Sequence, residues 1–234
     1  MAGRFIAPEQ LWLHDEVMRL VAFSPRLAGL AAELLGEPAI RIYHDNALSK
    51  EPGCGRTPWH HDAEHFPLAT LQAVTAWIPV TAIPAYMGPL ALARSAHGRD
   101  MVADLSFDKV GTTYDTAVAR RLVESDVAVD ASPFAVGEVS SHSALCFHTA
   151  GPNRSTQPRR RADTRGCTLD SAAHVKPEHA AGAARPWLSV EQPTVHTDRP
   201  GGRTPSAICP WTPRHAGPQR HTVTHDGTAK KRPG

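Results

Sequence analysis

The chain has 234 residues, of which 41% are hydrophobic and 21% charged, and its formal net charge is +2. This length suits one domain with its own core, followed by a tail. So small a net charge argues against nucleic acid or an anionic membrane as partner. No apolar run approaches the roughly 20 residues needed to cross a bilayer, and the start lacks the blocks of a signal peptide. The four cysteines are scattered without metal or disulfide spacing, so we expect a cytoplasmic protein.

The first part of the chain predicts two helices. Residues 9–22 place apolar side chains near one side, which indicates an amphipathic helix. Ser24 and Pro25 are typical of an N-cap and a first helical position, and we expect this second helix to end at Gly36. Two such helices usually cover a sheet.

From residue 38 onward the pattern changes to short β-prone segments separated by turns. Because helices come first and there is no alternation of strands with helices, an antiparallel sandwich or barrel is favoured over a parallel sheet. A short surface helix is predicted at residues 115–125. The predicted strands are residues 39–44, 59–62, 72–80 and 137–148, with another beginning at 87–92.

The last 64 residues (171–234) have a different composition, with nine prolines and six histidines among many small and polar residues. Such a segment has little apolar surface to bury, so we predict a mostly disordered tail. The irregular histidine spacing favours a solvated tail over a metal-binding tract. The predicted organisation is therefore a domain at residues 1–170 and a tail at 171–234.

A histidine and an aspartate two residues apart, His60 and Asp62, are the first candidate site residues. In an extended strand both side chains point to the same face, whereas His61 points to the other. This pair is a weak signal by itself, because it also occurs on ordinary surface strands. His44 and His65 have no such partner and are interpreted as ordinary polar residues.

His148 offers a third ligand at the end of a strand-like stretch, and arginines follow at residues 159–161. Two histidines and one carboxylate form the facial arrangement of non-haem Fe(II) oxygenases, which leaves three coordination positions free. An arginine could hold the far carboxylate of a keto acid, because its planar fork binds carboxylates bidentately. Taken singly, His148 could be a core or surface histidine and the arginines a basic surface run.

Considered together, the motifs make the sequence resemble the phytanoyl-CoA dioxygenase family of Fe(II)- and 2-oxoglutarate-dependent oxygenases, over roughly residues 5–160. Their order, separation and flanking residues agree jointly. The motifs lie at residues 50–53 (KEPG), 57–62 (TPWHHD), 75–80 (TAWIPV), 88–90 (GPL), 95–97 (SAH), 137–139 (GEV), 148–155 and 158–160 (PRR).

The resemblance implies a double-stranded β-helix, a mainly β jelly-roll or cupin-like barrel with flanking N-terminal helices. It implies that His60, Asp62 and His148 are the iron ligands and catalytic residues. Arg159, eleven positions after His148, would bind the distal carboxylate of 2-oxoglutarate. Trp77 would lie beside this cosubstrate, although a core tryptophan is an equally good interpretation.

The implied reaction hydroxylates an unidentified small organic molecule with dioxygen, while 2-oxoglutarate is decarboxylated to succinate; ascorbate is an optional reductant. Halogenating relatives carry a small residue in place of the carboxylate, so Asp62 favours oxygen insertion. Lys50 either approaches the cosubstrate or borders the pocket. The oligomeric state is not indicated.

Two departures from the family pattern support an alternative. The chain begins almost at its first helix, and residues 161–169 predict a poor inner strand, because the charges at 161, 163 and 165 share one face. The alternative is therefore a truncated or catalytically impaired member with a damaged closing strand. A zinc site is a third hypothesis, since the same ligands suit zinc, but an arginine at 159 has no use in a zinc hydrolase.

Overall fold

Two sheets form the body of the protein in the computed structural model, which describes residues 3–66, 68, 70–97, 101–108, 112–167 and 194–196. Within these ranges the larger sheet contains β1 (Phe5–Ile6), β2 (Ala39–Lys50), β4 (Ala73–Pro79), β7 (Ser140–Ser143), β9 (Arg159–Cys167) and β10 (Thr194–His196). The smaller sheet contains β3 (Thr57–His60), β5 (Leu90–His97), β6 (Val129–Asp130) and β8 (Cys146–Ala150).

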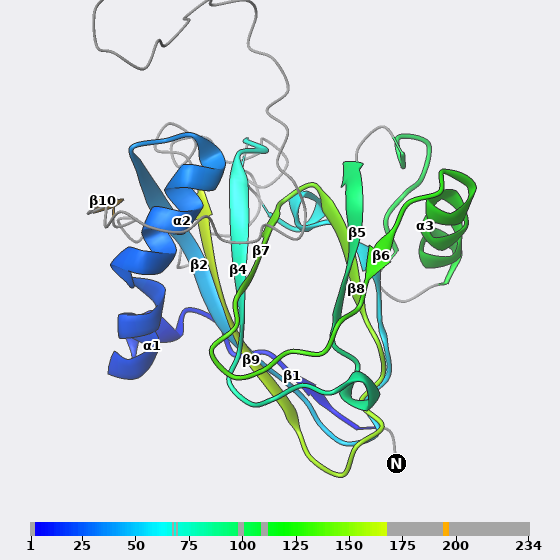
Figure 1. The fold of residues 1–234 in the computed structure, drawn as a ribbon, viewed down its shortest axis with the longest axis horizontal. Coiled ribbons are helices and arrows are strands. Elements are labelled where there is room, and N and C mark those ends of the chain that lie inside the picture. Colours follow the sequence, from blue (N-terminus) through cyan, green and yellow to red (C-terminus); the bar gives the residue numbers. More distant parts are fainter. Residues whose placement is uncertain are drawn as a thin grey trace, which may run out of the picture.

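The two sheets face each other across an interior space (Figure 1). The larger sheet has the order β1-β2-β9-β4-β7, with β10 also paired to β2, and the smaller has the order β3-β8-β5-β6. All paired strands in these sheets are antiparallel. The predicted antiparallel jelly-roll barrel with N-terminal helices is thus confirmed.

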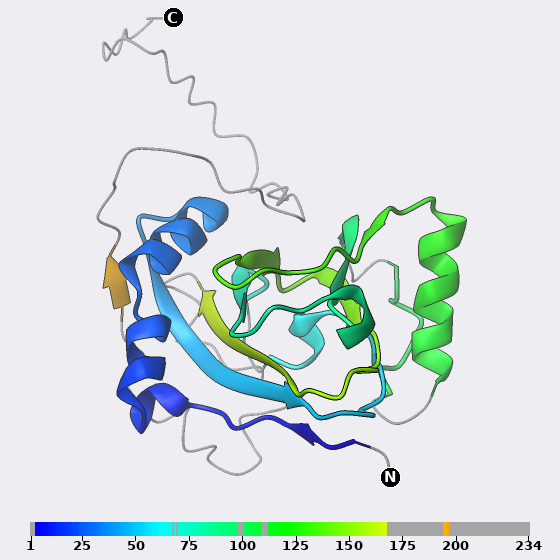
Figure 2. The same cartoon turned by 60° about the horizontal axis from the view of Figure 1, so that its bottom comes forward.

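Helices cover the outer faces of the sheets. Figures 1 and 2 show α1 (Glu16–Ala22) and α2 (Pro25–Leu35) beside the larger sheet, and α3 (Thr113–Glu124) beyond the smaller one. The helix predicted after Ser24 is confirmed, with Pro25 at its first position and Gly36 closing it in the left-handed conformation at φ 72°. The predicted surface helix at 115–125 corresponds to α3.

The single helix predicted at residues 9–22 is wrong. The chain forms a 3₁₀ turn, η1 (Leu11–Leu13), and then α1, which begins where the Asp15 carboxylate accepts a hydrogen bond from the Met18 N–H at 2.8 Å. The predicted apolar face is not buried either, because the side chains of Val17 and Leu20 remain exposed.

The apolar clusters that hold the helices lie outside the sheets. Ala28, Ala32 and Leu35 of α2 pack against Ile40 and Val74 of the larger sheet. On the other side, α3 contributes Tyr114, Val118 and Leu122 to a cluster with Trp59, Ala93, Val102 and Phe147. This arrangement leaves the facing surfaces of the sheets free to carry polar groups.

The prediction that the segment after Arg160 forms a poor strand is also wrong. β9 is paired along its length, with β2 from Arg41↔Cys167 to Lys50↔Arg159 and with β4 from Ala73↔Cys167 to Pro79↔Arg161. Its small residues, including Gly166, face outward, and a Cβ at Gly166 would lie 2.5 Å from Ile40 Cδ1. Arg159, Arg161 and Arg165 face the interior and line the cavity, with Asp163 between the last two, whereas Arg160 is exposed on the outer face.

Other predicted elements differ in extent. The strand predicted at residues 137–148 is two strands, β7 and β8, which belong to different sheets. The strand predicted at 39–44 is the first half of β2, and Met87 lies in a 3₁₀ turn, η3 (Ala85–Met87), before β5. The predicted tail lies outside the described residues except for β10. Among the described residues, no helix has both the length and the apolar character to cross a membrane.

Candidate metal centre

Three candidate ligands predicted from the sequence meet between the sheets. One ligand atom each from His60, Asp62 and His148 lies within 4.8 Å of the others. His60 ends β3 and pairs with His148 of β8, which places their ring centroids 4.2 Å apart. The strand predicted to run through Asp62 is wrong, because β3 ends at His60 and Asp62 begins a 3₁₀ turn, η2 (Asp62–Glu64). This turn brings the carboxylate to the two imidazoles.

The main chain orients both imidazoles in the same way. Nδ1 of His60 lies 2.8 Å from the Pro58 carbonyl, and Nδ1 of His148 lies 2.9 Å from the Cys146 carbonyl. Since a carbonyl accepts a hydrogen bond, each Nδ1 carries the proton and each Nε2 keeps its lone pair for a ligand-binding role. Burial, foremost among several causes, lowers the pKa of both rings, which favours the neutral form that a metal requires.

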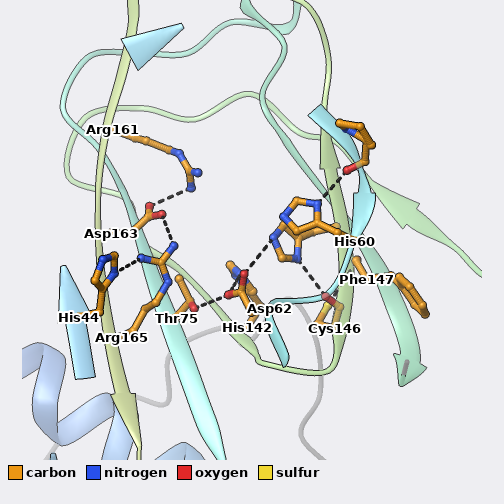
Figure 3. Close-up of polar contacts among 12 residues, drawn as sticks. His44, His60, Asp62, Thr75, His142, Cys146, Phe147, Arg161, Asp163 and Arg165 are labelled. Atoms are coloured by element: carbon orange, nitrogen blue, oxygen red, sulfur yellow. Dashed lines mark hydrogen bonds and ion pairs between the residues drawn. The ribbon is translucent and has the colours of Figure 1, made fainter. Parts of the chain in front are cut away.

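Asp62 is oriented from the opposite wall of the cavity. Its Oδ2 accepts a hydrogen bond from Thr75 Oγ1 at 2.6 Å and lies 3.6 Å from Nε2 of His142 (Figure 3). Its Oδ1 lies 3.7 Å from Nε2 of His148. Burial opposes ionisation, but His142, His148 and Arg165 together hold the pKa of Asp62 well below its usual value. The carboxylate is therefore ionised, with Oδ1 toward the imidazoles.

These three groups line a cavity of about 270 Å³ between the sheets. The volume lies just below the roughly 300–1,000 Å³ typical of ligand pockets. The wall formed by β9 contributes arginines, and the rim includes Phe5 and Glu9. A site of this size suits small organic molecules and excludes a polymer from its interior.

Arg159 and Trp77, the two residues predicted to contact the cosubstrate, both line this cavity. Arg159 is buried and donates a hydrogen bond from Nη1 to the Gly88 carbonyl, while its Nε has no hydrogen-bond partner among the described residues. Burial and the neighbouring Arg161 lower its pKa to about 9, so it stays charged at neutral pH. Trp77 is also a core tryptophan, since its ring packs on Phe134 with the ring centroids 4.6 Å apart within an apolar cluster, and its contact with the cosubstrate stays a prediction.

Two further arginines on β9 share one carboxylate. Asp163 accepts hydrogen bonds from Arg161 at 2.8 Å and from Arg165 at 3.2 Å, and it is fully buried (Figure 3). Arg165 also donates to Nδ1 of His44 at 2.9 Å. Burial, followed by the charge of Arg165, lowers the pKa of His44 to about 3, so its imidazole is neutral. Among the described residues His44 is not part of the candidate ligand cluster, in agreement with its interpretation as a polar residue, and its hydrogen bond supports Arg165.

The Lys50 side chain does not line the cavity. Its Nζ donates to the main-chain carbonyls of Gly55 at 2.9 Å, Gly151 at 3.1 Å and Ala150 at 3.4 Å. Burial and the adjacent Arg159 lower its pKa to about 7. Lys50 therefore links the loop at Gly55 to the main chain at residues 150–151, next to Arg159.

The sequence did not identify Thr75 or His142 as site residues. Thr75 begins the motif at residues 75–80 but was not singled out within it, and His142 lies in a short strand without a recognisable motif. The β4–β7 pairing, Thr75↔His142, brings them together under Asp62. His61, by contrast, points away from the ligand cluster as predicted, with its ring 5.3 Å from that of Phe147. His65 was interpreted as an ordinary polar residue, but it lines the cavity 5.5 Å from His60, measured between ring centroids.

Comparison with known proteins agrees with this geometry. The family model described as Phytanoyl-CoA dioxygenase (PhyH) matches residues 1–162. A search of curated proteins found no match. Solved structures with a similar fold include "the non-heme alpha ketoglutarate dependent epimerase SnoN from nogalamycin biosynthesis", with 22% identity, a TM-score of 0.59 and coverage of 90% of this chain and 74% of that chain.

Two other similar structures have comparable scores. The carbocyclase SnoK, also from nogalamycin biosynthesis, is 22% identical with a TM-score of 0.62, covering 83% of this chain and 77% of its own. EctD from S. alaskensis with bound Fe is 20% identical with a TM-score of 0.59, covering 78% of this chain and 62% of its own. At such identities the likeness establishes the fold.

Proposed function

Because the chain belongs to the phytanoyl-CoA dioxygenase family, we propose that it is an Fe(II)- and 2-oxoglutarate-dependent dioxygenase that hydroxylates a small organic molecule. The observation that carries this proposal is the meeting of His60, Asp62 and His148 within 4.8 Å, in a cavity that also contains Arg159. SnoN, in complex with Fe3+ and alpha ketoglutarate, has a similar fold.

The three clustered side chains would hold the iron. Two imidazole nitrogens and one carboxylate oxygen suit Fe(II) and leave positions open for a chelating keto acid and dioxygen. Thr75 fixes Asp62 so that one carboxylate oxygen points to the imidazoles. The carbonyls of Pro58 and Cys146 fix the tautomers of the two histidines, so each ring presents an unprotonated nitrogen without rearrangement.

Arg159 would bind the distal carboxylate of 2-oxoglutarate. It is buried, charged at neutral pH and has an unpartnered Nε among the described residues. Trp77 forms an apolar wall of the same cavity and helps to exclude water from it. When bound, iron and 2-oxoglutarate supply the oxidation: 2-oxoglutarate and O₂ yield succinate and CO₂, and one oxygen atom converts a substrate C–H into C–OH.

The first experiment is anaerobic addition of Fe(II) and then 2-oxoglutarate to the purified protein. We expect a visible metal-to-ligand charge-transfer band, followed by succinate formation when O₂ is admitted. Zinc in place of iron should give neither and is the negative control, whereas a zinc enzyme would give neither the band nor succinate with iron as well. A band without any succinate would support the alternative of an impaired family member.

Variants test the ligand assignment. We expect His60→Ala and Asp62→Ala to abolish both the band and succinate formation. The matched control is His14→Ala, an exposed histidine after η1, which should retain both. Unchanged turnover in either ligand variant would refute the proposed site. Circular dichroism of each variant separates loss of a ligand from loss of the fold.

A further inference from the structure

The inner face of β9 carries more positive charge than one cosubstrate neutralises. Arg159, Arg161 and Arg165 all line the cavity, and the carboxylate of Asp163 is buried between the last two. Each of the three guanidiniums has an Nε without a hydrogen-bond partner among the described residues. Burying a cation without a compensating anion is costly, so the surplus indicates an anionic ligand.

The charges can be counted for the complex of the proposed function. Fe(II) is balanced by Asp62 and by the chelating carboxylate of 2-oxoglutarate, and Arg159 is balanced by the distal carboxylate. Arg161 and Arg165 then face only Asp163, which leaves one positive charge.

The other titratable groups that line the cavity do not cancel this charge, and the buried Asp45, whose charge also acts on Arg165, lies outside the cavity lining, where it accepts a hydrogen bond from the Trp12 N–H at 3.1 Å. His44 is neutral because its pKa lies at about 3, and Lys50 can only add positive charge. Glu9 lines the rim 3.6 Å from His44, but its side chain is 57% exposed and therefore screened by water. His65 is the other imidazole outside the ligand cluster in the lining, and protonation would make it positive as well.

Arg161 is the better placed of the two arginines to meet a ligand. Arg165 is occupied by Asp163 and His44, and by the Asn46 side-chain oxygen at 3.0 Å when that amide is oriented to satisfy its neighbours. The guanidinium of Arg161 lies over the Trp77 ring, 5.4 Å from its centroid. In Figure 3 it extends from its strand into the space toward His60.

We propose that Arg161, supported by Arg165 through Asp163, binds a carboxylate of the substrate, so that the enzyme acts on a small carboxylic acid. This inference rests on the proposed function, because it assigns Arg159 to 2-oxoglutarate. A guanidinium placed over an aromatic ring, as Arg161 is over Trp77, can still present its N–H fork to a planar carboxylate. The substrate is small because it shares a cavity of about 270 Å³ with the cosubstrate.

The test uses three probes with the same carbon chain: butanoate, 1-butanol and butylammonium. Each is titrated by calorimetry into the full-length protein under anaerobic conditions, after Fe(II) and 2-oxoglutarate have produced the charge-transfer band. Butanoate should bind about 10-fold or more tightly than the other two probes, since only it can accept the charge-assisted hydrogen bonds.

Variants of β9 then locate the carboxylate. Arg161→Gln should weaken butanoate binding about 30-fold or more, because it removes one partner of a buried charge pair. Arg161→Lys keeps the charge without the planar fork, so its affinity for butanoate should lie between those of the wild type and Arg161→Gln. The matched control is Arg160→Gln, on the exposed face of the same strand, which should bind butanoate like the wild type. The charge-transfer band of each variant shows that its site has folded.

Several outcomes would overturn the inference while leaving the proposed function intact. These are competition of butanoate with 2-oxoglutarate, equal binding of 1-butanol, no detectable butanoate binding, or a loss of 2-oxoglutarate affinity in Arg161→Gln as large as in Arg159→Gln. In the last case Arg161 belongs to the cosubstrate site. Absence of the band from the wild type would instead refute the proposed function.

Discussion

The two walls of the cavity are built from similar antiparallel strands but carry different chemistry. The wall of the smaller sheet supplies two neutral imidazoles, with Asp62 on the turn that follows β3. The wall of the larger sheet supplies three guanidiniums on alternate positions of β9. One wall is suited to a cation and the other to anions, so a dianionic keto acid can bridge them.

The comparison shows that the inner face of a strand can carry the charge pattern of a solvent-exposed face. Charges at alternate positions of a strand normally indicate exposure to water. In β9 they face a ligand cavity instead, while Ala162, Thr164 and Gly166 form the buried outer face under the helices. The polarity of a barrel strand with a binding site is therefore the reverse of the usual pattern.

The largest effect is expected from removing the anion-binding group of the β9 wall. Arg159→Gln should raise the KM for 2-oxoglutarate about 30- to 100-fold, because a buried cation for the distal carboxylate is lost. The KM follows from succinate formation at varied 2-oxoglutarate. Arg160→Gln, its exposed neighbour, should leave the KM unchanged; an equal KM in Arg159→Gln would remove this residue from the cosubstrate site.

Thr75 of the larger sheet connects the two walls through its hydrogen bond to Asp62. Thr75→Val keeps the shape but removes the 2.6 Å hydrogen bond to Asp62, and it should weaken Fe(II) binding about 10- to 100-fold. Anaerobic Fe(II) titration at saturating 2-oxoglutarate measures this affinity. Thr75→Ser should recover most of it, and a Thr75→Val protein with wild-type affinity would show that Asp62 needs no such support.

The outer face of β9 can be tested by adding a methyl group. Gly166→Ala places a Cβ 2.5 Å from Ile40 Cδ1, so the free energy of unfolding in urea should fall by about 1–3 kcal/mol. The control is Gly29→Ala in α2, where a Cβ meets nothing within 4 Å and a gain of up to about 1 kcal/mol is expected. Equal stability of the two variants would contradict the tight packing of this face.

The smallest effect is a pH dependence that arises from His44. Its pKa is lowered from 6.5 to about 3 in the folded protein, so below pH 6.5 the unfolded chain binds a proton that the folded chain does not. Stability from this group is therefore lost as the pH falls from 6.5 toward 3, by about 1 kcal/mol at pH 5.5.

Comparison with His44→Gln isolates this contribution, because glutamine can still accept a hydrogen bond from Arg165 but does not titrate. The stability advantage of the wild type over the variant, measured by urea unfolding, should shrink by about 1 kcal/mol between pH 7.5 and 5.5. A constant difference across this range would show that His44 titrates normally in the folded protein.

Many residues of the candidate site could be predicted because they belong to short sequence motifs with a recognisable spacing. His60, Asp62, His148 and the arginine eleven positions after His148 are recognisable by type and spacing, and the structure brings these four residues to one cavity. The antiparallel class followed from helices that precede short strands. The boundaries of α2 followed from Pro25 and Gly36, whose backbone preferences act locally.

Only the tertiary structure decided which face of each strand is inside. The pairing of β4 with β7 places Thr75 and His142 next to Asp62. β9 forms a regular strand because β2 and β4 pair with it on both sides. The physical reason is that hydrogen bonding between strands and the desolvation of charges are set by neighbours far away in the chain, whereas residue spacing records only local geometry.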